Sequence, residues 1–150
     1  MKIYLAGPIS GQSYDQVVSK IHSIRKHLEK FGYTVFHPMT GKGNLRTEIK
    51  FKSVGYDGIP ASSNHAIYER DQWMVRQCDV ILADLSNSTR VSIGTMFELA
   101  WAAILGKHSL VVLDADNIHD HAFVLEAADI VFPSLKQAID YLEILSEGAE

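Results

Sequence analysis

The sequence has few of the features that mark disulfide-bonded, zinc-binding or membrane proteins. One cysteine, Cys78, occurs among 150 residues, which excludes an intrachain disulfide and a cysteine-based zinc cluster. No apolar run reaches the length of a membrane span, because Asp84 and Glu98 interrupt the longest candidate. A net charge of -4 gives no positive surface for nucleic acid, and the N-terminus has no signal-peptide layout. We therefore expect a single cytoplasmic domain, residues 1–150, that binds neither nucleic acid nor a membrane.

Strand-like apolar runs alternate with helical patterns along the chain. Between the runs 2–7 and 33–37, apolar residues recur at helical spacing, and a strand, helix and strand of this length form a βαβ unit. The other predicted strands are 79–85, 108–113 and 130–132, and the other predicted helices are 64–77, 92–105 and 135–145. This order predicts an α/β fold, a doubly wound, flavodoxin-like parallel sheet of five strands with helices on both faces.

The segment 39–63 shows no sustained periodicity. It contains four glycines and one proline, with a positive bias from Lys42, Arg46, Lys50 and Lys52. A structureless stretch of this length is unusual in a compact domain and is often functional. Two interpretations stay open, a solvated surface loop and a lid over an anionic or sugar-bearing ligand.

The segment 92–105 carries one charge, Glu98, in an otherwise neutral sequence. A helix that is apolar on all sides is normally buried, so this carboxylate is expected where desolvation is costly. A structural alternative exists, because Thr95 to Glu98 fits a capping box, in which the glutamate bonds to the backbone at the start of the helix. The segment alone does not choose between this role and catalysis.

A second carboxylate lies on the buried stripe of the helix 64–77. Ile67, Met74, Val75 and Cys78 mark that stripe, and Asp71 falls on it by i, i+4 spacing. Aspartate is rare at buried positions unless it is paired, and its sequence neighbours do not share its face of the helix. This pattern favours a functional role for Asp71.

In a doubly wound sheet, the loops after the strands converge on one crevice. This rule gathers Gly7, Pro8, Ile9 and Ser10, the segment 39–63, and Ser92 to Gly94 beside Glu98. Asp71 is expected to reach the same crevice from the side. Two partly buried carboxylates near the hydroxyl of Tyr4 suit cleavage at a glycosidic carbon, where one attacks the anomeric centre and the other handles a proton.

The loop 114–121 contains three aspartates and two histidines. The spacing of these residues matches no known metal site, and a solvated loop is the favoured interpretation.

The motifs Tyr4 to Pro8, Glu69 to Asp71, Asp79 to Leu85 and Ser92 to Leu99 together resemble the nucleoside 2-deoxyribosyltransferase superfamily. That superfamily includes the 2′-deoxynucleoside 5′-monophosphate N-glycosidases, and the resemblance covers nearly the whole chain. It implies a domain of the same fold, a deoxynucleoside or deoxynucleotide and a free nucleobase as binding partners, and no metal or organic cofactor.

The resemblance also implies roles for particular residues. Glu98 is the nucleophile that forms a covalent deoxyribosyl intermediate, Asp71 manages the proton on the base, and Tyr4 orients the nucleophile. Substrate contacts are expected from a further set: Gly7, Pro8, Ile9, Ser10, Ser92, Gly94 and Met96. The family completes each site with residues of a neighbouring subunit, so we expect a homo-oligomer whose sites are shared, completed by residues 117–121 or by Ala122 and Phe123.

Ser92 bears on the exact activity. At this position, six residues before the nucleophile, the well-studied transferases carry an aspartate that contacts the sugar 5′-hydroxyl, whereas the monophosphate hydrolases carry serine. A serine hydroxyl can donate to a 5′-phosphate that a carboxylate would repel. Our leading hypothesis is a nucleoside 2′-deoxyribosyltransferase. The alternatives are a 2′-deoxynucleoside 5′-monophosphate N-glycosidase, a nucleotide-sensing module without turnover and, more weakly, a flavin-binding protein.

Overall fold

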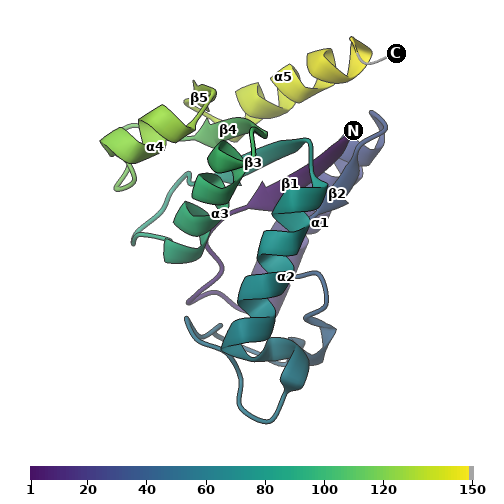
Figure 1. Ribbon diagram of the computed structural model, residues 1–150, viewed down its shortest axis with the longest axis vertical. Helices are drawn as coiled ribbons and strands as arrows, with labels where there is room; N and C mark the ends of the chain where they lie inside the picture. The colour runs from purple at the N-terminus through teal and green to yellow at the C-terminus, as the bar shows by residue number, and fades with distance from the viewer. Residues whose placement is uncertain (149–150) are drawn as a thin grey trace.

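The computed structural model describes residues 1–148 and contains a five-stranded parallel sheet with the strand order β2-β1-β3-β4-β5 (Figure 1). The strands are β1 (Lys2–Ala6), β2 (Thr34–Phe36), β3 (Val80–Asp84), β4 (His108–Val112) and β5 (Ile130–Phe132). The main helices are α1 (Tyr14–Glu29), α2 (Asn64–Gln77), α3 (Ile93–Ile104) and α5 (Leu135–Glu147). The order of the strands confirms the predicted doubly wound, flavodoxin-like fold.

The alternation of side chains along the strands supplies both faces of the sheet with apolar surface. On β1, Ile3 and Leu5 join one core cluster, to which α1 contributes Leu28 and α5 contributes Leu142. The intervening residues Tyr4 and Ala6 join a second cluster, made with α2, α3 and α4 (Ala122–Ala127). Helices therefore cover both faces, as the sequence predicts.

Helix α4 and the structure within 39–63 were not predicted. Helix α4 has six residues, too few to show a helical period. The segment 39–63 contains two short 3₁₀ turns, Gly43–Leu45 and Pro60–Ser62. It packs its own small apolar cluster from Met39, Leu45, Phe51 and Tyr56 against Val17 of α1. The interpretation of this segment as a solvated loop holds only in part: more than half of its residues are exposed, but four of its apolar side chains are buried together.

The segment 39–63 surrounds the N-terminal end of α2, at the bottom of Figure 1. It lies at the side of the sheet where the parallel strands end, so it becomes a wall of the crevice that those strand ends define. None of the helices within residues 1–148 combines the length and apolar character needed to cross a membrane.

Candidate active site

Glu98 forms the centre of the site. It lies in the second turn of α3 and is 5% exposed. The hydroxyl of Tyr4, a fully buried residue of β1, donates to Glu98 Oε1 over 2.6 Å. Ser92 is the N-cap of α3, with its side chain accepting from the Thr95 backbone, so the alternative of a capping box formed by Thr95 and Glu98 was wrong. With Ser92 as the N-cap, the third helical residue is Thr95, and Glu98 lies three residues too far along α3 to reach the N-cap backbone amide.

The surroundings of Glu98 raise its pKa. Burial and the nearby charge of Asp71 raise the pKa of Glu98 to about 8, against a smaller opposing effect of the Tyr4 hydrogen bond and Lys42. Burial, followed by the charge of Glu98, raises the pKa of Tyr4 well above its usual value. Tyr4 therefore stays protonated and acts as a donor to the carboxylate.

Asp71 faces the same space from the middle of α2. It is 8% exposed, and its Oδ1 atom is buried without a hydrogen-bond partner within residues 1–148. Burial raises the pKa of Asp71, and the charges of Lys42 and Arg70 oppose that rise. Both carboxylates line one cavity of about 560 Å³, a volume within the range of small-molecule sites.

The cavity also gathers most of the other predicted residues. Gly7, Pro8, Ile9 and Ser10 line it from the β1–α1 loop, and Ser92 and Gly94 line it from the start of α3. Met96 does not line it, because its side chain packs against the core between the sheet and α2 and α3. Tyr4 is likewise behind the cavity wall and acts through Glu98.

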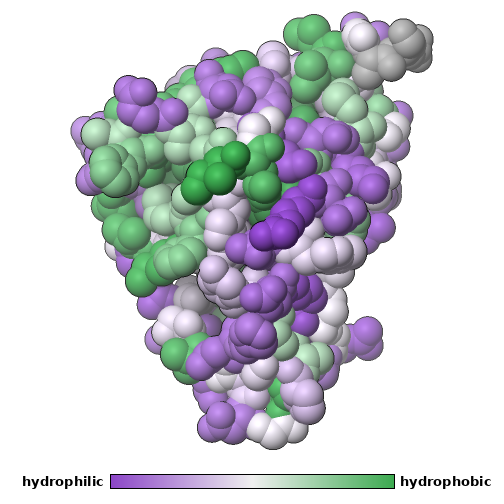
Figure 2. Space-filling model, viewed as in Figure 1, coloured by the Kyte–Doolittle hydropathy of each residue, from purple (hydrophilic) through white to green (hydrophobic). Residues whose placement is uncertain are grey.

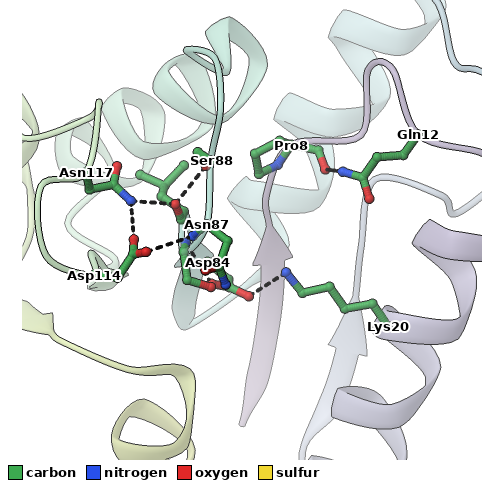
Figure 3. A network of polar contacts seen from close by, with 10 residues as sticks. Pro8, Gln12, Lys20, Asp84, Asn87, Ser88, Asp114 and Asn117 are labelled. Carbon is green, nitrogen blue, oxygen red and sulfur yellow. Dashed lines mark hydrogen bonds and ion pairs between the residues drawn. The ribbon is translucent and has the colours of Figure 1, made fainter.

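Polar contacts fix the loops that follow β1 and β3 (Figure 3). Lys20 of α1 forms an ion pair with Asp84 at the end of β3, over 2.7 Å, and Gln12 donates to the Pro8 carbonyl, over 2.7 Å. Gly7 lies so close to β3 that a Cβ there would stand 3.1 Å from the Asp84 carbonyl oxygen. A side chain at position 7 would therefore push apart the two strand ends that carry the site.

The loop 114–121 supports α3 within the same chain. Asn117 donates to the carbonyl of Leu85 over 2.7 Å, and its Oδ1 accepts from the His119 backbone over 2.9 Å. His119 Nε2 in turn accepts from the Ser92 backbone N–H over 2.9 Å. Asn117 and His119 are buried, so the interpretation of this loop as solvated was wrong for these two residues. Within residues 1–148, no group of three or more histidine, cysteine, aspartate or glutamate side chains is placed to hold a metal ion.

Three residues of the site were not singled out from the sequence. Lys42 is 3% exposed and lines the cavity with Asp71 and Glu98, although the sequence showed it only as one of four basic residues in its segment. Arg90 lines the rim, and His119 supports Ser92 from below. None of the three lies in a periodic element, so no pattern marks it.

Residues 3–138 match the family described as nucleoside 2-deoxyribosyltransferase. The chain belongs to this family. A curated relative, the 5-hydroxymethyl-dUMP N-hydrolase of Danio rerio, is 30% identical over 111 residues. That alignment covers 73% of this chain and 66% of the relative, so the chain spans just under two thirds of the relative's length.

Two solved structures share the nucleoside 2-deoxyribosyltransferase fold of this chain. The 2-deoxyribosyltransferase of Bacillus psychrosaccharolyticus has a TM-score of 0.65 at 22% identity, over 94% of this chain and 92% of that one. The Clostridium botulinum CMP N-glycosidase BcmB has a TM-score of 0.61 at 18% identity, over 97% of this chain and 99% of that one. The named relatives of this family member thus include a transferase and two enzymes that cleave nucleotides.

Proposed function

We propose that this protein cleaves the N-glycosidic bond of 2′-deoxynucleosides or their 5′-monophosphates, with Glu98 as the nucleophile. One observation carries the proposal. The buried carboxylate of Glu98, which accepts a 2.6 Å hydrogen bond from Tyr4, lines the same nucleotide-sized cavity as the buried carboxylate of Asp71. Such an arrangement suits covalent catalysis at a sugar carbon, with the second group handling a proton.

In the first step, ionised Glu98 attacks C1′ of the sugar. A C1′–O bond forms, the C1′–N bond breaks, and its electron pair leaves with the base. In the second step, water attacks C1′ and the bond to Glu98 breaks, which restores the carboxylate. The proton lost by water passes to the departed base, and we assign Asp71 to relay it. The net products are a free base and 2-deoxyribose, or 2-deoxyribose 5-phosphate when the substrate is a monophosphate. A second base in place of water gives transfer.

The rim of the cavity favours a 5′-monophosphate as the substrate. Arg90 lies against Gly11 of the β1–α1 loop, since a Cβ at Gly11 would stand 2.7 Å from Arg90 Nη2. The hydroxyls of Ser10 and Ser92 line the same cavity. A guanidinium and hydroxyl donors suit a phosphate. Together with the nucleotide hydrolase among the relatives, this leads us to favour the monophosphate N-glycosidase over the transferase.

Product chromatography separates these activities. The protein is incubated with a deoxynucleoside or its 5′-monophosphate, with and without a second free base. Release of base from the monophosphate, with no new nucleotide when the second base is present, supports the hydrolase. A new nucleoside or nucleotide supports the transferase. Glu98→Ala should remove either activity. A wild-type protein that binds the nucleotide without turnover, with the same affinity in Glu98→Ala, would instead support a sensing module.

The variant Ser92→Asp tests the phosphate contact. Aspartate is as good an N-cap as serine, so α3 should keep its stability. Its carboxylate would repel a 5′-phosphate, and we expect kcat/KM for the monophosphate to fall at least about tenfold, with activity on the nucleoside retained. Ser92→Asn, a neutral N-cap, is the matched control.

We also propose that the protein is a homo-oligomer whose copies share their active sites. Apolar side chains are exposed on α3 and α4, and we call this set the α3–α4 surface: Ile93, Phe97, Ile104, Leu105, Phe123 and Leu125. Figure 2 shows hydrophobic residues gathered over these helices. Because Asn117 and His119 are engaged within their own chain, Phe123, 81% exposed, is our candidate to reach a neighbour's site.

A further inference from the structure

Two opposite charges face the cavity without being paired to each other. Lys42 and Asp71 are 3% and 8% exposed, and both line the cavity. No ion pair joins Lys42 to either carboxylate within residues 1–148. Asp71 Oδ1 has no hydrogen-bond partner in the same part of the chain. Leaving buried charged groups unpaired is costly, so this arrangement indicates that a ligand completes it.

Burial raises the pKa of Asp71 and lowers the pKa of Lys42, and the opposite charge of each group opposes that effect on the other. The charges of Lys42 and Arg70 favour the ionised form of Asp71 against the effect of burial on its pKa. Burial lowers the pKa of Lys42, and the charge of Asp71 opposes that fall more strongly than Arg70 reinforces it. Arg70 does not line the cavity, and its Nη1 donates to the Ala61 carbonyl over 2.7 Å. In their ionised forms, Lys42 offers the cavity a donor-only ammonium and Asp71 an acceptor-only carboxylate.

We propose that Lys42 and Asp71 together select the nucleobase, by binding a ring N–H and the adjacent carbonyl oxygen. The Lys42 ammonium donates to the carbonyl oxygen, and the Asp71 carboxylate accepts from the N–H. Uracil, thymine, hypoxanthine and guanine present this edge. With the sugar held at Glu98 and the base in the same position, cytosine and adenine place an amino group against Lys42 and an unprotonated ring nitrogen against Asp71. Both contacts then become donor against donor and acceptor against acceptor. This inference rests on the proposed function and names its substrate class, bases with an oxo group.

The same contact assists bond cleavage. The electron pair that leaves C1′ is delocalised onto the carbonyl oxygens of an oxo base. A positive charge already in place beside such an oxygen stabilises the departing anion without reorganisation. The Lys42 contribution therefore grows as the bond breaks, and it is expected in kcat as well as in substrate affinity.

Two substrate pairs test the preference, dUMP against dCMP and dIMP against dAMP. For the wild type we expect kcat/KM to favour the oxo member of each pair by about 10- to 100-fold, the discrimination of a good bidentate contact. In Lys42→Met the preference should fall below about threefold, mainly through loss of activity on dUMP and dIMP. Lys42→Gln, whose amide nitrogen still donates, should keep part of the preference. Lys50→Met, an exposed lysine of the same segment that does not line the cavity, should match the wild type.

Binding of free bases separates this inference from the proposed reaction. Uracil and cytosine, or hypoxanthine and adenine, are titrated into wild type and Lys42→Met by calorimetry, with thermal unfolding of each variant as a check on folding. Tighter binding of the oxo bases, lost in Lys42→Met, supports the inference even if no glycosidic bond is cleaved. Equal affinity for both members of each pair overturns it, as does an unchanged preference in a folded Lys42→Met protein.

Discussion

At the scale of single residues, burial of Glu98 makes the stability of the protein depend on pH. Because its pKa is raised to about 8 in the folded protein, its contribution to stability is fully present below the unfolded pKa of 4.5 and is lost as pH rises through about 8. Glu98→Gln has no charge to bury. We expect it to stabilise the protein at pH 8 by roughly 2–4 kcal/mol more than at pH 5. Urea unfolding at both pH values measures this, and Glu126→Gln, on an exposed position, should show no such difference.

Removal of the Tyr4 hydroxyl should change how kcat/KM depends on pH. In the proposed reaction the nucleophile is ionised Glu98, so kcat/KM should rise as pH increases through about 8. The Tyr4 hydrogen bond favours the ionised carboxylate, and its removal in Tyr4→Phe should move this rise to higher pH and lower kcat/KM at pH 7 by roughly 10- to 100-fold. Part of the loss should be recovered at high pH. A uniform loss across all pH values would show that Tyr4 does not act through the ionisation of Glu98.

At the scale of elements, the start of α3 depends on a loop remote in sequence. His119 Nε2 accepts from the Ser92 N–H, so its other nitrogen carries the proton and donates to Asn117 Oδ1 over 3.1 Å. His119→Ala removes the imidazole, so the Ser92 N–H loses its acceptor and Asn117 Oδ1 loses the donor Nδ1–H. We expect a loss of about 1–3 kcal/mol in urea unfolding and a raised KM. Asp120→Ala, at the exposed neighbouring position, should change neither quantity, and equal effects of both variants would contradict the assignment.

Helices could be predicted from the sequence where the apolar residues recurred at helical spacing over several turns. The helix 64–77 was predicted with the bounds that α2 has. The predicted helix 92–105 extends one residue beyond α3 at each end, and Gly106, with a positive φ of 66°, follows it. Helix α4 escaped notice because its six residues complete less than two turns. A charged residue stands out against an apolar pattern, so Asp71 and Glu98 could be found. Lys42 and His119 lie in aperiodic segments and become buried only through contacts distant in sequence, which no local pattern records.

At the scale of the whole molecule, one surface is not explained by the fold of a single chain. Ile104 of α3 is 85% exposed, and the aromatic ring of Phe97 stacks edge-on with Trp101, whose side chain lines the cavity. The α3–α4 surface therefore adjoins the site. An apolar surface of this kind next to a binding site is typical of an interaction surface. A second copy that covers it would also shield the cavity from solvent.

Ile104→Asp tests that arrangement, because it introduces a charge at the most exposed residue of the α3–α4 surface. We expect the wild type to sediment as an oligomer and Ile104→Asp to shift to the monomer, since an unpaired carboxylate buried in an apolar contact opposes association. If copies share their sites, kcat/KM should fall together with association and should recover as protein concentration rises. Ile49→Asp alters an equally exposed isoleucine in the segment 39–63, away from this surface, and should affect neither property. A wild type that sediments as a monomer at full activity would show that each chain completes its own site.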